Sequence, residues 1–129
     1  MLKHVSFVTA DADAAAAFYT GLGAVVSKDV LTAEGFRRLV LSFEGGGKLQ
    51  FFQAAGERPS PDARWMEHVA LHLSDLHGHI ERLKTQGTVF TRELSLSPSG
   101  NPLAFVLDPD GRQVELLQTG EGCNSEMRG

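Results

Sequence analysis

The sequence predicts an α+β fold built from two tandem modules, each with the element order βαβββ. Residues 4–11 (HVSFVTAD) and 68–75 (HVALHLSD) share an initial His-Val, an apolar alternation and a final Asp, at an offset of 64 residues. The same offset relates Gly23 to Gly87. A repeat of about 60 residues with its landmarks in the same order predicts a duplicated structural unit.

The first module begins with a strand followed by a helix. Residues His4–Thr9 alternate and are rich in Val and Phe, which predicts a strand. Asp11 or Asp13 can accept hydrogen bonds from the free N–H groups of the next turn, and Ala14–Leu22 favours a helix. Gly23 suits the left-handed residue that ends a helix.

Extended segments complete both modules. In the first they are Ala24–Val30, Phe36–Phe43 and Lys48–Gln53. The second module has a strand at 68–73, a helix from about Ser74 to Gln86 with Ser74 as its cap, and strands at about 88–94, 102–107 and 112–118. We therefore predict one domain over 1–129, with modules at about 2–53 and 66–118 and a tail at 119–129.

Composition excludes several classes of protein. The chain has 129 residues, of which 42% are hydrophobic and 22% charged, and this balance predicts a globular domain. A net charge of −4 gives no general attraction to nucleic acid or to an anionic membrane. No apolar stretch is long enough to span a bilayer, and the lone Cys123 cannot form an internal disulfide. These features predict a soluble, cytoplasmic protein with a single domain.

Polar residues recur at four corresponding strand positions. His4 and His68 begin the first strand of each module, and Gln50 and Glu115 lie in the last strands. Two imidazoles, an amide oxygen and a carboxylate suit a divalent metal such as Zn, Ni, Co, Mn or Fe. The alternative is that both histidines bond to backbone groups and that Glu115 is a solvated charge.

The chain resembles the vicinal oxygen chelate superfamily over about residues 2–118. The segments that support the resemblance are FYTGLGAVV (18–26), EHVALHLSD (67–75) and FVLDPDGRQVELLQ (105–118). The resemblance implies glyoxalase-like modules whose curled mixed sheet forms a cup with a metal on its floor. The ligands implied are His4, Gln50, His68 and Glu115.

The resemblance implies glyoxalase-like lyase or isomerase chemistry on a small vicinal-oxygen substrate, with Glu115 as the base. The chain departs from the usual pattern at Gln50, where glutamate is commoner, and at Val8, where an arginine would hold the carboxylate of glutathione. Arg37 or Arg38 could bind an anion instead. Substrate contacts are predicted for Arg37, Phe52, His72 and Phe105.

Other members of the superfamily offer alternatives. A CoA-ester epimerase matches at Gln50, but its second acid–base carboxylate would have to be Glu44. An Fe(II) extradiol dioxygenase or a fosfomycin transferase expects a tyrosine where this chain has Phe105. A metal-free protein of the bleomycin-binding type would trap a flat ligand between aromatic walls, for which the candidates are Phe36, Phe43, Phe51, Phe52 and Trp65.

The size of the modules also predicts an oligomeric state. Each module of about 60 residues is too small to enclose a pocket by itself. We therefore expect a homodimer in which both chains contribute ligands to each site.

Overall fold

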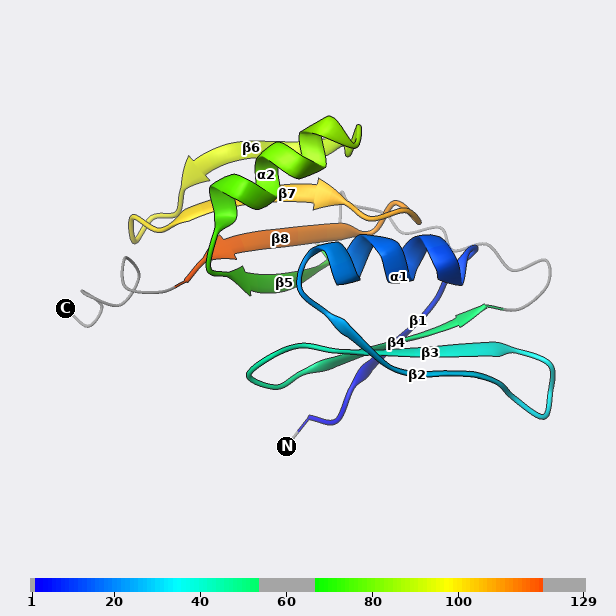
Figure 1. Ribbon diagram of the computed structural model, residues 1–129. Coiled ribbons are helices and arrows are strands. Elements are labelled where there is room, and N and C mark those ends of the chain that lie inside the picture. Colours follow the sequence, from blue (N-terminus) through cyan, green and yellow to red (C-terminus); the bar gives the residue numbers. More distant parts are fainter. Residues whose placement is uncertain (1, 54–66, 120–129) are drawn as a thin grey trace. The chain divides into compact units, whose positions relative to one another are not determined.

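The computed structural model describes residues 2–53 and 67–119 (Figure 1). The chain forms two compact units that divide between residues 61 and 62, and each unit has one helix and a four-stranded mixed sheet. The α+β class and the two βαβββ modules predicted from the sequence are confirmed. No helix in the described segments is long and apolar enough to cross a membrane.

The first unit places its helix on one face of its sheet. Its elements are β1 (Val5–Val8), α1 (Ala12–Gly21), β2 (Val25–Leu31), β3 (Arg37–Ser42) and β4 (Lys48–Gln53). The strand order is β1-β4-β3-β2, with β1 parallel to β4 and the other pairs antiparallel. Tyr19 of α1 packs on Phe51 with ring centroids 5.4 Å apart, and Phe7 flanks Phe51 at 5.9 Å. Phe51 is therefore a core residue of this unit.

The second unit repeats this arrangement. Its elements are β5 (His68–Leu73), α2 (Leu76–Thr85), β6 (Phe90–Leu96), β7 (Pro102–Leu107) and β8 (Gln113–Gln118). The strand order is β5-β8-β7-β6, again with the first pair parallel and the others antiparallel. The helix buries Leu76, Ile80 and Leu83, and the sheet buries Val106, Val114 and Leu116.

Two side chains bond to the start of α1. The carboxylate of Asp11 accepts hydrogen bonds from the backbone N–H groups of Asp13 and Ala14, at 3.0 and 3.2 Å. Gln53, at the end of β4, accepts the N–H of Ala12 through Oε1 at 2.6 Å. The first N–H groups of the helix, which have no partner inside the helix, therefore find acceptors. α1 begins at Ala12, two residues before the predicted start at Ala14.

The start of α2 is built in the same way, which corrects one prediction. The cap is Asp75, not Ser74, and its carboxylate accepts the N–H of Gly78 at 3.1 Å. Gln118, at the end of β8, accepts the N–H of Leu76 at 3.0 Å. Ser74 instead accepts a hydrogen bond at its carbonyl oxygen from Gln118 Nε2 at 2.9 Å, so the helix starts one residue after Asp75.

The strand register decides which side chains share a face. We call the face of each sheet that is turned away from its own helix the far face. In the first unit Ser6, Gln50 and Val40 are neighbours across β1, β4 and β3. The same far face contains Val8, Lys28, Val30, Arg38, Ser42, Lys48 and Phe52.

The equivalent neighbours in the second unit are Ala70, Glu115 and Phe105, across β5, β8 and β7. Its far face also contains His68, His72, Arg92, Leu103, Gln113 and Leu117. The predicted polar positions of each module therefore gather on one face of one sheet, opposite the helix.

Candidate functional site

The second unit brings together an imidazole and a carboxylate. His68 is the first residue of β5 and Glu115 the third residue of β8, and His68 Nε2 lies 3.1 Å from Glu115 Oε1. The two side chains are 30% and 17% exposed. Phe105 lies beside Glu115 on β7 and turns its ring edge-on to His68, with centroids 5.3 Å apart. The pair is thus partly buried and bounded on one side by an aromatic ring.

This pair fits a divalent metal. A neutral imidazole nitrogen and a carboxylate oxygen both offer lone pairs, and both are common ligands of first-row cations. Metal–ligand bonds of about 2.1 Å place neighbouring ligand atoms roughly 3.0–3.4 Å apart, depending on geometry. The observed separation of 3.1 Å therefore suits two ligands of one ion.

The equivalent pair of the first unit is also in contact, but it has a further neighbour. Gln50 Nε2 lies 3.3 Å from His4 Nε2 and donates to the hydroxyl oxygen of Ser6 at 3.1 Å. Arg38 Nε donates to Gln50 Oε1 at 2.6 Å. Gln50 is 6% exposed, so these bonds fix a buried amide.

The contact with Arg38 determines which atom Gln50 presents to His4. A guanidinium group can only donate, so the amide oxygen faces Arg38 and the amide N–H groups face Ser6 and His4. An N–H group has no lone pair for a metal. As it is held, the His4–Gln50 pair therefore does not fit a metal ion, and Gln50 would have to turn its amide over and break the bond to Arg38.

The four predicted ligands fall two in each unit. Among residues 2–53 and 67–119, no group of three or more His, Cys, Asp or Glu side chains has the spacing to hold a metal. Each unit provides one pair, and a set of four requires groups from two units.

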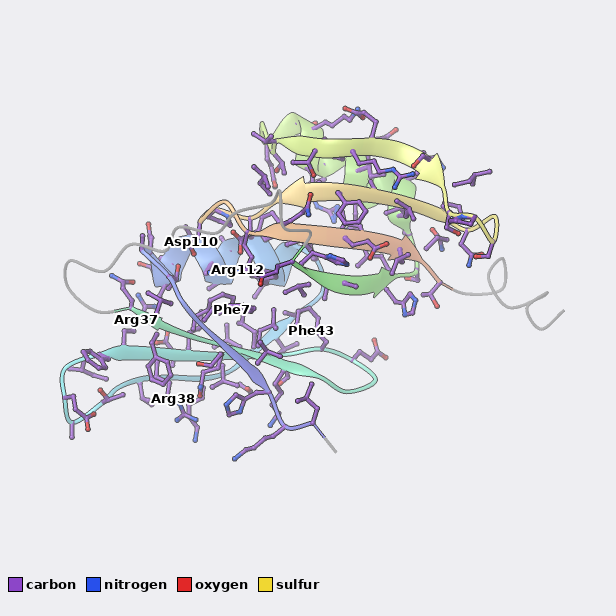
Figure 2. All side chains as sticks on the ribbon, turned by 180° about the vertical axis from the view of Figure 1, so that it is seen from behind. Phe7, Arg37, Arg38, Phe43, Asp110 and Arg112 are labelled. Carbon is purple, nitrogen blue, oxygen red and sulfur yellow. The ribbon has the colours of Figure 1, made fainter. Side chains whose placement is uncertain are left out.

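Arg37 lies on the α1 side of its sheet, and Arg38 lies on the other side (Figure 2). Arg37 bonds to both carboxylate oxygens of Asp29 at 3.0 Å and to Asp13 of α1 at 2.9 Å. The hydrogen bond from Arg37 lowers the pKa of Asp29 below its ordinary value, and the same bond raises the pKa of Arg37.

The other three residues predicted to contact substrate lie on the far faces. Phe52 is in register with Val8 and with Arg38, and His72 is in register with Leu117. Phe105 contacts His68, as described above. Trp65, a candidate for an aromatic wall, lies outside the described residues.

Sequence reasoning did not single out the contact between Arg38 and Gln50. The signal was present in the alternation of β3, because residues 38, 40 and 42 share a face and the antiparallel pairing with β4 places that face beside Gln50. Alternation does not specify which side chains on a face bond to each other.

Comparison with known proteins identifies similar chains. A probable lactoylglutathione lyase of Synechocystis sp. is 27% identical over 128 residues, covering 92% of this chain and 95% of that protein. A glyoxalase family protein from Enterococcus faecalis superposes with a TM-score of 0.70 at 28% identity, covering 91% of this chain and 96% of that one.

Glyoxalase I from Zea mays has a TM-score of 0.76 at 22% identity, a likeness of fold. This chain spans only 44% of the length of the maize protein. The family model for the Glyoxalase/Bleomycin resistance protein/Dioxygenase superfamily matches residues 1–116. The duplicated βαβββ units and this match together show that the chain belongs to the Glyoxalase/Bleomycin resistance protein/Dioxygenase superfamily.

Proposed function

We propose that the protein is a metal-dependent, glyoxalase-like lyase or isomerase that acts on a small substrate with vicinal oxygens, with Glu115 as the base. The observation that supports this most directly is the contact between His68 and Glu115 at 3.1 Å on the far face of the second unit. The similarity to proteins named lactoylglutathione lyase supports the same reaction class.

Glu115 is placed to move a proton. Its Oε1 is held by His68, whereas Oε2 has no hydrogen-bond partner within the described segments. A C–H on one of two adjacent oxygenated carbons would lose its proton to Oε2, and Glu115 would return that proton to the other carbon. His68 fixes the rotamer of Glu115, and the ring of Phe105 excludes water from one side of His68.

The metal would be held by His68 and Glu115, with His4 and Gln50 as the further predicted ligands from a first unit. When bound, such an ion would polarise the vicinal oxygens and so acidify the C–H group on one of the two carbons that carry them. Gln50 would join only after its amide releases Arg38. Because each unit supplies two of the four groups, we propose that the protein is a homodimer in which both chains contribute ligands to each site.

Matched substitutions test the proposal. Glu115→Gln should reduce proton transfer by roughly 10²–10⁴-fold, measured with the methylglyoxal–glutathione adduct and by exchange of substrate hydrogen with deuterated solvent. His68→Ala should lower the metal content of the freshly purified protein. Exposed residues provide the controls, because Glu67→Gln and His77→Ala make the same chemical changes away from the far face. Stoichiometric metal that is unaffected by His68→Ala would contradict the ligand assignment.

A metal-free binding protein is the second candidate, and one observation favours it. The amide of Gln50 is turned toward Arg38, so the first unit presents hydrogen-bond donors where a metal would need a lone pair. Metal analysis separates the two candidates, since a binding protein would contain no stoichiometric metal and would not exchange substrate hydrogen.

A further inference from the structure

The far face of the first unit is positively charged. It contains Lys28, Arg38 and Lys48. The strands of this unit contain one acidic residue, Asp29, and it lies on the opposite face, where it bonds to Arg37. Within residues 2–53 the strands therefore place no carboxylate on the far face to neutralise these cations.

Arg38 is fixed in place by one end of its guanidinium group. Its Nε bonds to the oxygen of the buried Gln50, and Ser6 holds the other end of that amide. The terminal nitrogens of Arg38 make no hydrogen bond or ion pair within the described parts of the chain. Arg37 differs, because two carboxylates occupy its guanidinium group.

We propose that this far face is a carboxylate-binding site and that Arg38 binds the carboxylate through its two terminal nitrogens. The planar fork of a guanidinium group matches the two oxygens of a carboxylate, and such paired, charge-assisted bonds are among the strongest in proteins. Binding also requires no reorganisation of Arg38, because the bond to Gln50 already sets its orientation.

The position of Gln50 explains why the ligand is an anion. In the second unit the corresponding residue is Glu115, which adds a negative charge next to its histidine. In the first unit the neutral amide points its oxygen at a cation and presents N–H groups to the other side. The side chains of Arg38 and Gln50 therefore present mainly hydrogen-bond donors and positive charge. This arrangement attracts a carboxylate and repels a dication.

This inference deepens the proposed function and rests on it in one respect, that the bound carboxylate belongs to the substrate. It concerns the state in which Gln50 keeps its bond to Arg38 and is not a metal ligand, so that the metal is held by His68 and Glu115. The substrate class is then a small carboxylic acid that also has vicinal oxygens and a hydrogen on one of the carbons that carry them, such as a 3-hydroxy-2-oxo acid. Pyruvate is a suitable probe, and methyl pyruvate is its neutral ester of similar shape.

Binding to the full chain tests the proposal without reference to turnover. Titration of pyruvate is followed by calorimetry and by the ¹⁵N NMR signal of the Arg38 Nε–H group, assigned from its loss in Arg38→Gln. The wild-type signal should shift with pyruvate and not with methyl pyruvate. Arg38→Gln should weaken pyruvate binding by about ten- to a hundredfold, the range for hydrogen bonds to a charged group, and Arg38→Lys should weaken it less.

Two matched variants make the result specific. Arg37→Gln removes the same charge from the other face and should bind pyruvate within about twofold of wild type. Glu93→Gln removes an exposed charge from the second unit and should also bind pyruvate within about twofold of wild type. Turnover of Glu115→Gln is measured separately and tests the proposed function, not the carboxylate site. The proposal is overturned if Arg38→Gln binds pyruvate as wild type does, if Arg37→Gln loses as much affinity, or if the wild-type Arg38 signal does not move.

Discussion

The two units share one fold and differ in the chemistry of their far faces. In each unit a histidine at the start of the first strand touches the third residue of the last strand, which is Gln50 in one unit and Glu115 in the other. The strand beside each of these residues also differs. On β3, two residues before the partner of Gln50, the side chain is Arg38, and at the equivalent position on β7 it is Leu103.

This difference suggests how duplicated halves divide a task. The second unit keeps an imidazole and a carboxylate in contact with each other, a pair that fits a metal and a base. The first unit keeps its histidine, but the guanidinium group of Arg38 has captured the amide oxygen of Gln50. In our proposal, one unit transfers the proton and the other holds the anion.

Exchanging the two residues should produce the largest effect. Gln50→Glu combined with Glu115→Gln should reduce turnover by about 10²–10⁴-fold, because a glutamate at position 50 would pair with Arg38 and would not accept a proton. Adding Arg38→Leu, the residue type found at Leu103, should free that glutamate and raise metal binding by about tenfold. Metal content and turnover are measured together, and full activity of the double variant would contradict the division between the units.

The helix starts should respond to loss of their glutamine acceptors in both units. Gln53→Ala and Gln118→Ala each remove the acceptor of one helix N–H group and should lower the free energy of unfolding by about 0.5–2 kcal/mol. The loss should be larger for Gln118→Ala, because Gln118 also donates to the carbonyl oxygen of Ser74. Urea denaturation measures both, with Gln86→Ala as a control because the side chain of Gln86 forms no hydrogen bond within residues 2–53 and 67–119. A smaller loss for Gln118→Ala than for Gln53→Ala would contradict this prediction.

The smallest effect is expected at the ion pair between Asp29 and Arg37. Asp29→Asn should lower the free energy of unfolding by about 0.2–1 kcal/mol near neutral pH, since the pair is largely exposed. The folded-state pKa of Asp29 is depressed, so its contribution is complete above the ordinary value of 3.8 and is lost as the pH falls through the lowered pKa.

Unfolding at neutral pH and at about pH 2 measures this change, with Glu93→Gln as the matched variant in the second unit. Glu93 pairs with Lys84 of α2 as Asp29 pairs with Arg37, and its side chain is more exposed. A difference between wild type and Asp29→Asn that persists at low pH would mean that the charge of Asp29 is not its source.

Much of the fold followed from the sequence because its signals are local. Gly23 and Gly87 have positive φ angles of 106° and 81° after each helix, as their positions indicated. Most predicted strands lie within two residues of their observed bounds, since alternation of apolar residues and turn residues fixes them. The cap of α2 was misplaced because Ser74 and Asp75 are both good caps, and only contacts formed in the fold select between them.

The candidate site was harder to predict. The face shared by His68 and Glu115 follows from alternation, and so does the face of Gln50. The direction of the amide of Gln50 depends on Arg38, which belongs to a different strand, and no periodicity in one strand indicates such a bond.

The outer strands β2 and β6 have a consequence for aggregation. Each is the last strand of its sheet and contains exposed apolar residues such as Val25, Leu31 and Leu96. Each also has a register shift beside a pair of opposite charges, Lys28-Asp29 in β2 and Arg92-Glu93 in β6. Bulges and charges at a sheet edge hinder pairing with another chain. The duplication therefore copied a protection against fibre-like association together with the fold.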